Sequence, residues 1–281
     1  HRYGAKISCE LVHAGRSAPK QFRPNSPAIA PSAIPVENGP TDIREMDERD
    51  MEAIRNEYCD VAQRLMKSGF DMVMVHAAHG NLLAQFLSPK YNQRTDEYGG
   101  SAENRARFAV EAVKAIRSRL PEIPIDYKLA VRQEDPHYGN AGVVESELGI
   151  FVPLLTDAGV TSFHVTLANH SSLEDTIPPA NHPYFKEQGC FLKFCDEVRQ
   201  YTDKPITGVG GLNQPDFVEQ QLASGRITCA AMSRQLLADP EWPNKVASGQ
   251  IKEIHRCVRC NKKCLGGLQQ HQGTHCIYEK V

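Results

Sequence analysis

"FDMVMVHAAHGN" (residues 70–81) joins an apolar run to a polar turn, and this combination decides the fold class. The run 70–77 shows little polar alternation, as expected for a strand that is buried on both faces. The run leads into a short turn, and His76 and His79 share this turn. In proteins built from parallel strands, catalytic and binding groups gather at the carboxyl ends of strands. The stretch therefore predicts a buried parallel strand with functional residues at its end.

The pattern of an apolar run followed by an amphipathic run recurs along the chain. We expect strands at 6–12, 70–77, 124–131, 161–168, 205–211 and 229–234. We expect helices near 47–68, 103–119, 145–158, 185–201, 214–224 and 240–248. Six β-then-α units in series indicate a parallel sheet covered by helices. The predicted fold class is therefore α/β, a (β/α)8 TIM barrel, a fold that takes about 250 residues and eight units. Six units are visible, and we expect the first two strands before His1.

Two segments fall outside these units. Residues 17–46 are rich in proline and serine and are expected to form a long surface loop. Residues 251–281 are rich in cysteine. We therefore expect a barrel domain at 1–250 and a separate segment at 251–281.

The composition is that of an ordinary globular chain. Of its 281 residues, 41% are hydrophobic and 23% are charged. A net charge of −2 does not indicate the positively charged surface that binds nucleic acid. No apolar run approaches the roughly 20 residues that span a bilayer. The chain shows neither an initiator Met nor a signal peptide. We therefore expect a fragment of a cytoplasmic protein, a compartment in which disulfides are rare.

Polar residues follow most of the expected strands: His13, His76, His79, Lys128, Asn169, His170, Ser233 and Arg234. The glycine run 208–211 adds backbone N–H groups that can approach a phosphate closely, and Arg234 can add a bidentate charge. These features favour a phosphate-bearing cofactor at the last two strand ends. The plainer alternatives are a simple glycine turn, a surface ion pair at Arg234, and hydrogen-bonded core histidines at His13 and His164.

"CVRCNKKCLGGLQQHQGTHC" (257–276) combines four cysteines with two histidines. Disulfides are disfavoured in the expected compartment. Zinc is an alternative, because a C-x2-C…H-x3-H pattern is present: Cys257, Cys260, His271 and His275. That set leaves Cys264 and Cys276 unused, whereas four thiolates are the standard ligands of a [4Fe–4S] cluster.

Several motifs together carry a family resemblance: "HAAHGNLLAQFLSPKYNQRTDEYGGSAENRARF" (76–108), "ELVHAGR" (10–16), "GVGG" (208–211) and "MSRQLLADP" (232–240). They resemble the old yellow enzyme family of FMN-dependent oxidoreductases, over nearly the whole chain. The cysteine spacing C-x2-C-x3-C-x11-C narrows the resemblance to the iron–sulfur branch, which includes 2,4-dienoyl-CoA reductase, enoate reductases, bile-acid 4-desaturases and trimethylamine dehydrogenase. This branch implies two further barrel strands upstream and FAD- and NAD(P)H-binding domains downstream.

The resemblance implies cofactor positions. Glu10 stands where the family usually has Gln beside the flavin pyrimidine edge, and Lys128 stands where Arg usually faces flavin N1 and O2. The implied phosphate site comprises Gly210, Gly211, Ser233 and Arg234. The implied [4Fe–4S] ligands are Cys257, Cys260, Cys264 and Cys276. A cluster would relay single electrons to FMN, which can release two as a hydride.

The resemblance also implies catalytic positions. His76 and His79 match the pair that grips a substrate oxygen, where N–H groups stabilise developing negative charge. His170 matches an active-site histidine of the dienoyl-CoA reductases. Asn81 replaces the usual proton-donating Tyr, and a carboxamide is not a useful general acid at neutral pH. Protonation then falls to His170, Tyr184 or water.

The leading function is reduction or formation of a C=C bond conjugated to a carbonyl in a small molecule, such as an enoyl-CoA, an enoate or a 3-oxosteroid. The alternative is an amine dehydrogenase or N-demethylase of the trimethylamine dehydrogenase type. Such enzymes use an aromatic cage for a cation, and Trp242 is the single Trp here. A zinc-stabilised binding module is a third alternative. Neither a nucleic-acid nor a membrane partner is expected. The sequence leaves open whether the protein forms a homo-oligomer.

Overall fold

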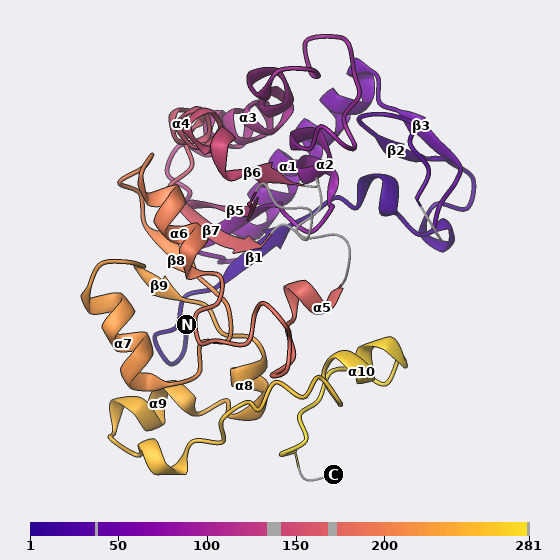
Figure 1. The fold of residues 1–281 in the computed structure, drawn as a ribbon. Helices are drawn as coiled ribbons and strands as arrows, with labels where there is room; N and C mark the ends of the chain where they lie inside the picture. Colours follow the sequence, from indigo (N-terminus) through magenta and orange to yellow (C-terminus); the bar gives the residue numbers. More distant parts are fainter. Residues whose placement is uncertain (37–38, 134–141, 168–172, 280–281) are drawn as a thin grey trace.

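The computed structural model describes residues 1–36, 39–133, 142–167 and 173–279. Its centre is a parallel seven-stranded sheet of order β1-β4-β5-β7-β8-β9, with β6 paired to β5. The strands are β1 (Ser8–Leu11), β4 (Met72–Ala77), β5 (Ile125–Arg132), β6 (Val143–Val144), β7 (Ser162–Leu167), β8 (Ile206–Gly208) and β9 (Cys229–Ala230). Figure 1 shows that the sheet curls. The predicted fold class, α/β and TIM-barrel-like, is confirmed.

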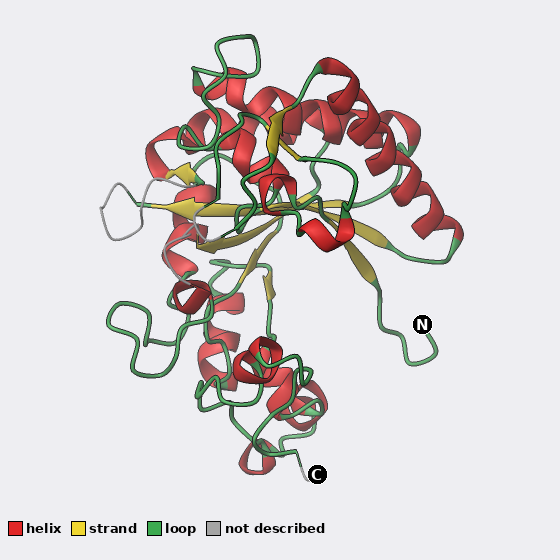
Figure 2. Ribbon diagram, turned by 90° about the vertical axis from the view of Figure 1, so that its right-hand side faces the viewer, coloured by secondary structure: helices red, strands yellow, loops and turns green. Residues whose placement is uncertain are grey.

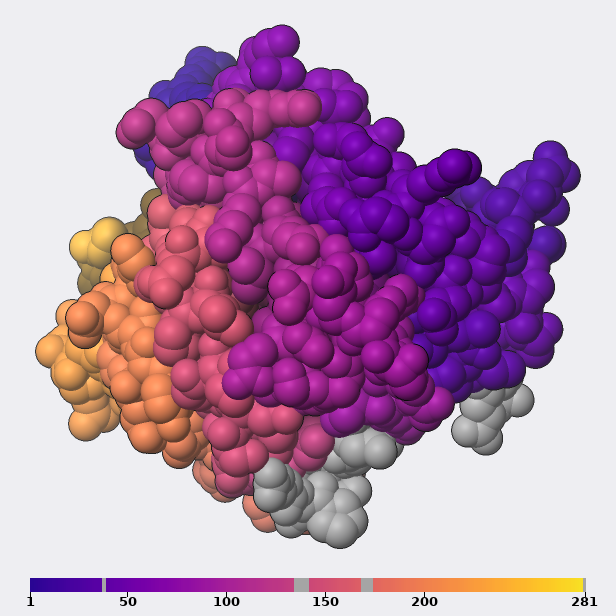
Figure 3. Space-filling view, turned by 90° about the horizontal axis from the view of Figure 1, so that it is seen from above, coloured from indigo at the N-terminus to yellow at the C-terminus, as the bar shows by residue number. Residues whose placement is uncertain are grey.

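Helices cover the outer face of the sheet (Figure 2). The longer ones are α1 (Glu48–Lys67), α3 (Ala102–Arg119), α4 (Leu148–Ala158), α6 (Leu192–Arg199) and α7 (Pro215–Ala223). The chain also has shorter helices, of which α9 and α10 lie apart from the sheet (Figure 1): α2 (Leu82–Leu87), α5 (Leu173–Thr176), α8 (Arg234–Ala238), α9 (Trp242–Ala247) and α10 (Leu265–Gln269). Seen from above, the colours pass from purple through magenta to orange, so successive units lie side by side (Figure 3). None of the helices within the described ranges is both long and apolar enough to cross a membrane.

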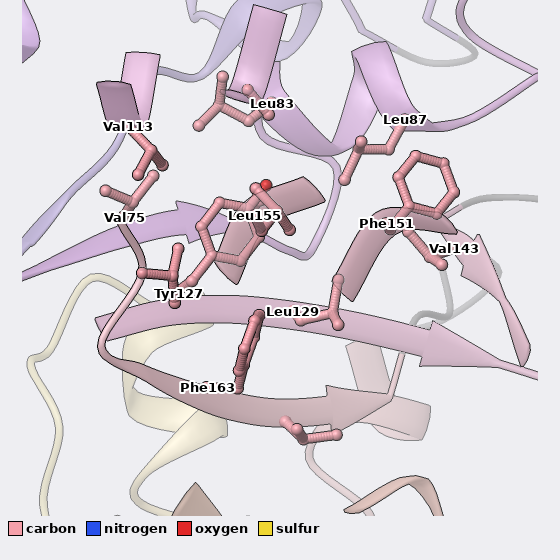
Figure 4. Packing of buried hydrophobic residues seen from close by; sticks show 14 of the residues in the cluster. Val75, Leu83, Leu87, Val113, Tyr127, Leu129, Val143, Phe151, Leu155 and Phe163 are labelled. Carbon is pink, nitrogen blue, oxygen red and sulfur yellow. The ribbon is translucent and has the colours of Figure 1, made fainter. Parts of the chain in front are cut away.

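The core lies between the sheet and these helices. Val75, Tyr127 and Phe163 are in register across β4, β5 and β7 and are fully buried. Figure 4 shows them pointing toward the layer of helices, where α3 and α4 contribute side chains such as Val113 and Leu155. Because side chains alternate along a strand, the residues directly before and after each of these three in its own strand face the opposite side. The same register therefore places a second set of side chains inside the curl of the sheet.

Local signals set the ends of the main helices. α1 begins at a capping box in which Asp47 accepts from the Asp50 backbone and Asp50 accepts from the Asp47 backbone. α3 begins at Ser101, whose hydroxyl accepts from the backbone of Asn104. α4 ends at Gly159, which has a φ of 113° that favours glycine.

The segment 17–46 differs from the predicted plain surface loop. It forms a second, two-stranded parallel sheet from β2 (Ala28–Ala30) and β3 (Ile43–Glu45). Arg23 makes two hydrogen bonds of 2.8 Å to the carboxylate of Asp42, which ties the two arms of the segment together. A contact between residues so far apart leaves no pattern in the local sequence.

All six expected strands are present, but the last two end earlier than predicted. β8 stops at Gly208 because Gly210 and Gly211 have φ values of 127° and 70°, which are incompatible with a strand. β9 stops at Ala230, and Arg234 is the first residue of α8 rather than the end of a strand. The expected helix 185–201 is also shorter, because α6 begins only at Leu192.

Candidate active site

Charged side chains from three neighbouring strands meet inside the curl of the sheet. Glu10 of β1 accepts a hydrogen bond of 3.0 Å from Nζ of Lys128 in β5. The same oxygen lies 2.9 Å from Nε2 of His76 in β4. The hydrogen bond from His76 is the main cause that lowers the pKa of Glu10 to about 2, and the charge of Lys128 adds to it. Glu10 is therefore ionised at neutral pH and accepts from two donors.

His76 lies at the end of β4, and His79 and Asn81 follow it on the turn that leads into α2. Nδ1 of His76 accepts from the backbone N–H of Ala78 at 3.2 Å and lies 3.2 Å from Nδ2 of Asn81. The ring centroids of His76 and His79 are 5.3 Å apart, and His79 has a left-handed φ of 53°. His76 thus uses both ring nitrogens within the protein, whereas the sequence interpretation directed them at a substrate oxygen.

Further polar groups lie beside this cluster on β5 and on the neighbouring strand β7, where His164 is in register with Lys128. Asp126 of β5 accepts from the hydroxyl of Ser162 at 2.6 Å and lies 3.9 Å from Nδ1 of His164. Burial raises the pKa of Asp126 to about 6. Burial, together with the charge of Lys128, lowers the pKa of His164 to about 4, so His164 is neutral. Sequence reasoning missed Asp126, although its place two residues before Lys128 puts both on one face of β5.

A cavity of about 280 Å³ opens at the ends of β8 and β9. It brings together all four residues of the predicted phosphate site: Gly210, Gly211, Ser233 and Arg234. A Cβ atom on Gly210 would lie only 2.8 Å from the backbone nitrogen of Phe191. Within the described ranges, the N–H groups of Gly210 and Gly211 have no hydrogen-bond partner. N–H donors without a protein partner, near a guanidinium, are the chemistry that binds phosphate, so these residues fit the phosphate end of FMN.

Arg234 is positioned by neutral acceptors. Its Nη1 donates to the carbonyl of Pro178 at 3.0 Å and to Oδ1 of Asn261 at 2.7 Å. Sequence reasoning missed a second arginine in the same cavity, Arg259. Its guanidinium donates to the carbonyls of Phe185, at 3.2 Å, and of Lys186. Arg259 stands inside the cysteine pattern, which drew attention to the cysteines instead.

The four clustered cysteines line one smaller cavity next to the first: Cys257, Cys260, Cys264 and Cys276. Cys257 and Cys264 also line the larger one. Across the described residues, no three His, Cys, Asp or Glu side chains are close enough to hold a single metal ion. A [4Fe–4S] cluster has a cysteine at each of its irons, so its four ligand sulfurs stand around a cage rather than around one ion. Four thiols around one cavity fit this group.

The alternative zinc ligands are not gathered in this way. His275 lies at the cavity, but its Nδ1 is 2.9 Å from the carboxylate of Glu279. His271 is exposed and is not among the described residues that line the cavity.

The remaining candidates lie apart from the polar cluster or beyond the described ranges. Asn169 and His170 fall outside the described residues. Nδ1 of His13 accepts from the backbone of Gly15 at 3.0 Å, and burial lowers the pKa of His13. Tyr184 is largely exposed. Trp242 is buried and donates to the carbonyl of Asn213 at 3.2 Å, which gives it a structural role.

Comparisons with known sequences agree with this architecture. The profile of the NADH:flavin oxidoreductase / NADH oxidase family matches residues 1–253. A bilirubin reductase of Clostridium symbiosum is 50% identical over 289 residues, a match that covers 100% of this chain and 76% of that protein. An NADH oxidase of Thermoanaerobacter brockii is 34% identical, with 95% of this chain and 40% of that protein covered.

Two solved structures have a similar fold. Histamine dehydrogenase from Rhizobium sp. 4-9 superposes with a TM-score of 0.87 at 30% identity, over 99% of this chain and 39% of that chain. A 2-naphthoyl-CoA reductase superposes with a TM-score of 0.85 at 27% identity, over 99% and 43% of the two chains. The 281 residues thus span about two fifths of these two chains.

The raised pKa of Asp126 predicts a dependence of stability on pH. The folded protein holds a proton that the unfolded chain, with an ordinary carboxyl pKa of 3.8, releases. The free energy of unfolding therefore falls as pH rises from about 4 to above 6. Asp126→Asn keeps the acceptor for Ser162, so it should raise stability at pH 7 and flatten this fall, as measured by urea unfolding. The exposed Asp157→Asn is the control, and an equal effect of both substitutions would contradict the assignment.

Proposed function

Because this chain belongs to the NADH:flavin oxidoreductase / NADH oxidase family, we propose that it reduces a C=C bond conjugated to a carbonyl group, with FMN and a [4Fe–4S] cluster as cofactors. The observation that carries this proposal is a pair of features on the same parallel sheet, one on β1, β4 and β5 and the other after β8 and β9. The Glu10–Lys128–His76 cluster offers charged and polar partners for a flavin ring. The glycine-lined cavity at β8 and β9 offers donors for its phosphate. FAD and NAD(P)H are proposed as further cofactors of the complete protein.

FMN supplies a hydride when it is bound, and the side chains of this chain prepare the substrate. Lys128 contributes a positive charge inside the curl of the sheet, and the ionised Glu10 holds it in place. His79 is proposed to donate an N–H to the carbonyl oxygen, where negative charge develops as the β-carbon is reduced. Asn81 cannot supply the proton that completes the reaction, so protonation is assigned to another group or to water.

The names of the relatives support this reading. The bilirubin reductase shares half of its aligned residues with this chain, and bilirubin carries C=C bonds conjugated to carbonyl groups. The second fold match is a 2-naphthoyl-CoA reductase, which is named for a substrate with a carbonyl next to an unsaturated ring. Both names describe the reduction of conjugated systems beside a carbonyl.

An amine dehydrogenase is the second candidate, because histamine dehydrogenase has a TM-score of 0.87 with this chain. The position of the single Trp favours the first candidate. Trp242 is buried in a structural position and so cannot form one wall of an aromatic cage.

A single-turnover experiment tests the function. The reduced full-length protein is mixed anaerobically with bilirubin or a simple enone, and the reoxidation of flavin is followed by absorbance. His79→Ala should slow reoxidation by on the order of 10²-fold, because one donor to the developing charge is lost. His271→Ala, at an exposed site that lines neither cavity, is the control. If no unsaturated carbonyl compound reoxidises the flavin and N-methylated amines reduce it, the amine dehydrogenase is the correct function.

Removal of the cavity arginine tests the FMN site. Arg234→Ala should markedly weaken the retention of FMN by the full-length protein, because the guanidinium beside the glycine N–H groups is lost. Equilibrium dialysis with fluorescence detection measures the affinity. Arg226→Ala, which breaks an exposed ion pair of 2.5 Å with Asp196, should leave it unchanged. Equal affinities of the Arg234 variant and the wild type would remove Arg234 from the site.

The cysteine segment gives a prediction about metal content. Cys264→Ser should lower iron and acid-labile sulfide in anaerobically purified full-length protein, because one of four thiolate ligands is lost. The double variant His271→Ala/His275→Ala should leave both contents unchanged. Stoichiometric zinc without acid-labile sulfide in the wild type would identify a zinc site instead.

A further inference from the structure

Arg234 lies in the wall of both cavities. It lines the larger cavity together with Gly210, Gly211 and Ser233, and it also lines the smaller cavity that the four clustered cysteines share. A side chain that belongs to both walls can transmit a change in one site to the other. The bonds that hold this side chain therefore decide whether the two sites act independently.

The guanidinium of Arg234 is held through one of its nitrogens. Nη1 carries two hydrogens, which go to the carbonyl of Pro178 at 3.0 Å and to Oδ1 of Asn261 at 2.7 Å. Neither acceptor carries a formal charge, so these bonds leave the positive charge of Arg234 in place. Among the described residues, none accepts a hydrogen bond from Nε or Nη2. These donors remain available to an anion such as a phosphate.

The amide of Asn261 has one possible orientation. Its Oδ1 accepts from Arg234, and its Nδ2 donates to the carbonyl of Ile177 at 2.8 Å. A guanidinium only donates and a carbonyl only accepts, so rotation of the amide by 180° would break both bonds. The backbone is anchored as well, because the carbonyl of Asn261 accepts from the N–H of Gly266 at 2.9 Å. Asn261 is thus a fixed acceptor for Arg234.

The place of Asn261 in the sequence ties this acceptor to the cysteine loop. Asn261 directly follows Cys260 and stands three residues before Cys264. It lines the cysteine cavity and is not among the residues that line the larger one. Its φ of 55° is left-handed, a conformation that Asn adopts more readily than most residues. The path of the chain between these two cysteines therefore sets where the amide meets Arg234.

We propose that Asn261 is a positioning residue, which holds Arg234 in place for the FMN phosphate and so makes the retention of FMN depend on the cysteine loop. This inference rests on the proposed function, because it assigns FMN to the larger cavity. An arginine side chain has several rotatable bonds, and fixing them on binding costs conformational entropy. The bond to Asn261 restricts the guanidinium before the ligand arrives. Without the amide, only the bond to Pro178 would remain.

The test compares FMN with riboflavin, which is the same flavin without the phosphate. Dissociation constants are measured by equilibrium dialysis on oxidised full-length protein from which flavin has been removed. Asn261→Gly deletes the amide and suits the left-handed φ. It should weaken FMN binding by about tenfold, the effect of one hydrogen bond to a charged group. Riboflavin binding should be unchanged, because riboflavin has no phosphate for Arg234 to contact.

A double-mutant cycle shows whether Asn261 acts through Arg234. Arg234→Ala should weaken FMN binding, and Asn261→Gly should cause no further loss in the Arg234→Ala background. His271→Gly is the matched control. His271 also has a left-handed φ, of 57°, but it is exposed and lines neither cavity. His271→Gly should bind both flavins as the wild type does.

Three results would overturn the proposal. The first is wild-type affinity for FMN in Asn261→Gly. The second is an equal loss of affinity for FMN and riboflavin, because the amide would then support the general structure of the site rather than the phosphate contact. The third is an additive effect of the two substitutions in the cycle, because Asn261 would then act independently of Arg234.

The same measurements separate this inference from the proposed function. If the wild type binds no FMN, the cofactor of the proposed function is wrong and both proposals fail. If Arg234→Ala weakens FMN binding while Asn261→Gly does not, only this inference fails. The reoxidation of flavin by unsaturated carbonyl compounds, which tests the reaction itself, is not part of either comparison.

Discussion

The parallel register of β4, β5 and β7 is the constraint on which both faces of the sheet depend. It aligns Val75, Tyr127 and Phe163 beneath the helices, and by alternation it aligns His76, Lys128 and His164 on the other side. A slip of one residue would exchange the two sets. The charge of Lys128 would then face a dry core without a partner, at a cost of several kcal/mol. The packing under the helices therefore also holds the charged cluster in place.

Within that cluster, one anion organises the chemistry. The Glu10 carboxylate accepts from an ammonium and from an imidazole. Because a carboxylate can only accept, it places a hydrogen on Nε2 of His76 and so sets the tautomer of that ring. A glutamine at this position could present its NH2 group to the imidazole and reverse that tautomer. The departure from the family pattern at Glu10 therefore decides which nitrogen of His76 carries the hydrogen.

The sequence was informative where the pattern is local. Long apolar runs predicted all six strands, and the histidine turn and the glycine run were found at their ends, because alternation and glycine φ values act on neighbouring residues. It could not show which polar groups meet. The bond between Glu10 and His76 depends on pairing of β1 with β4. Asp126 and Arg259 matter because burial and a cavity surround them, and neither leaves a signature in a short window. The extra strands β2 and β3 depend on tertiary contacts in the same way.

The ion pair between Lys128 and Glu10 joins residues 118 positions apart in the chain. Closing so long a loop costs conformational entropy before any contact compensates it, and topologies rich in distant pairings fold slowly for that reason. No shorter piece of the sequence can build the cluster, since β1, β4 and β5 must all be paired first. During folding, the charged groups remain in water until the sheet has closed. The cluster is therefore assembled only in molecules that have reached the correct topology.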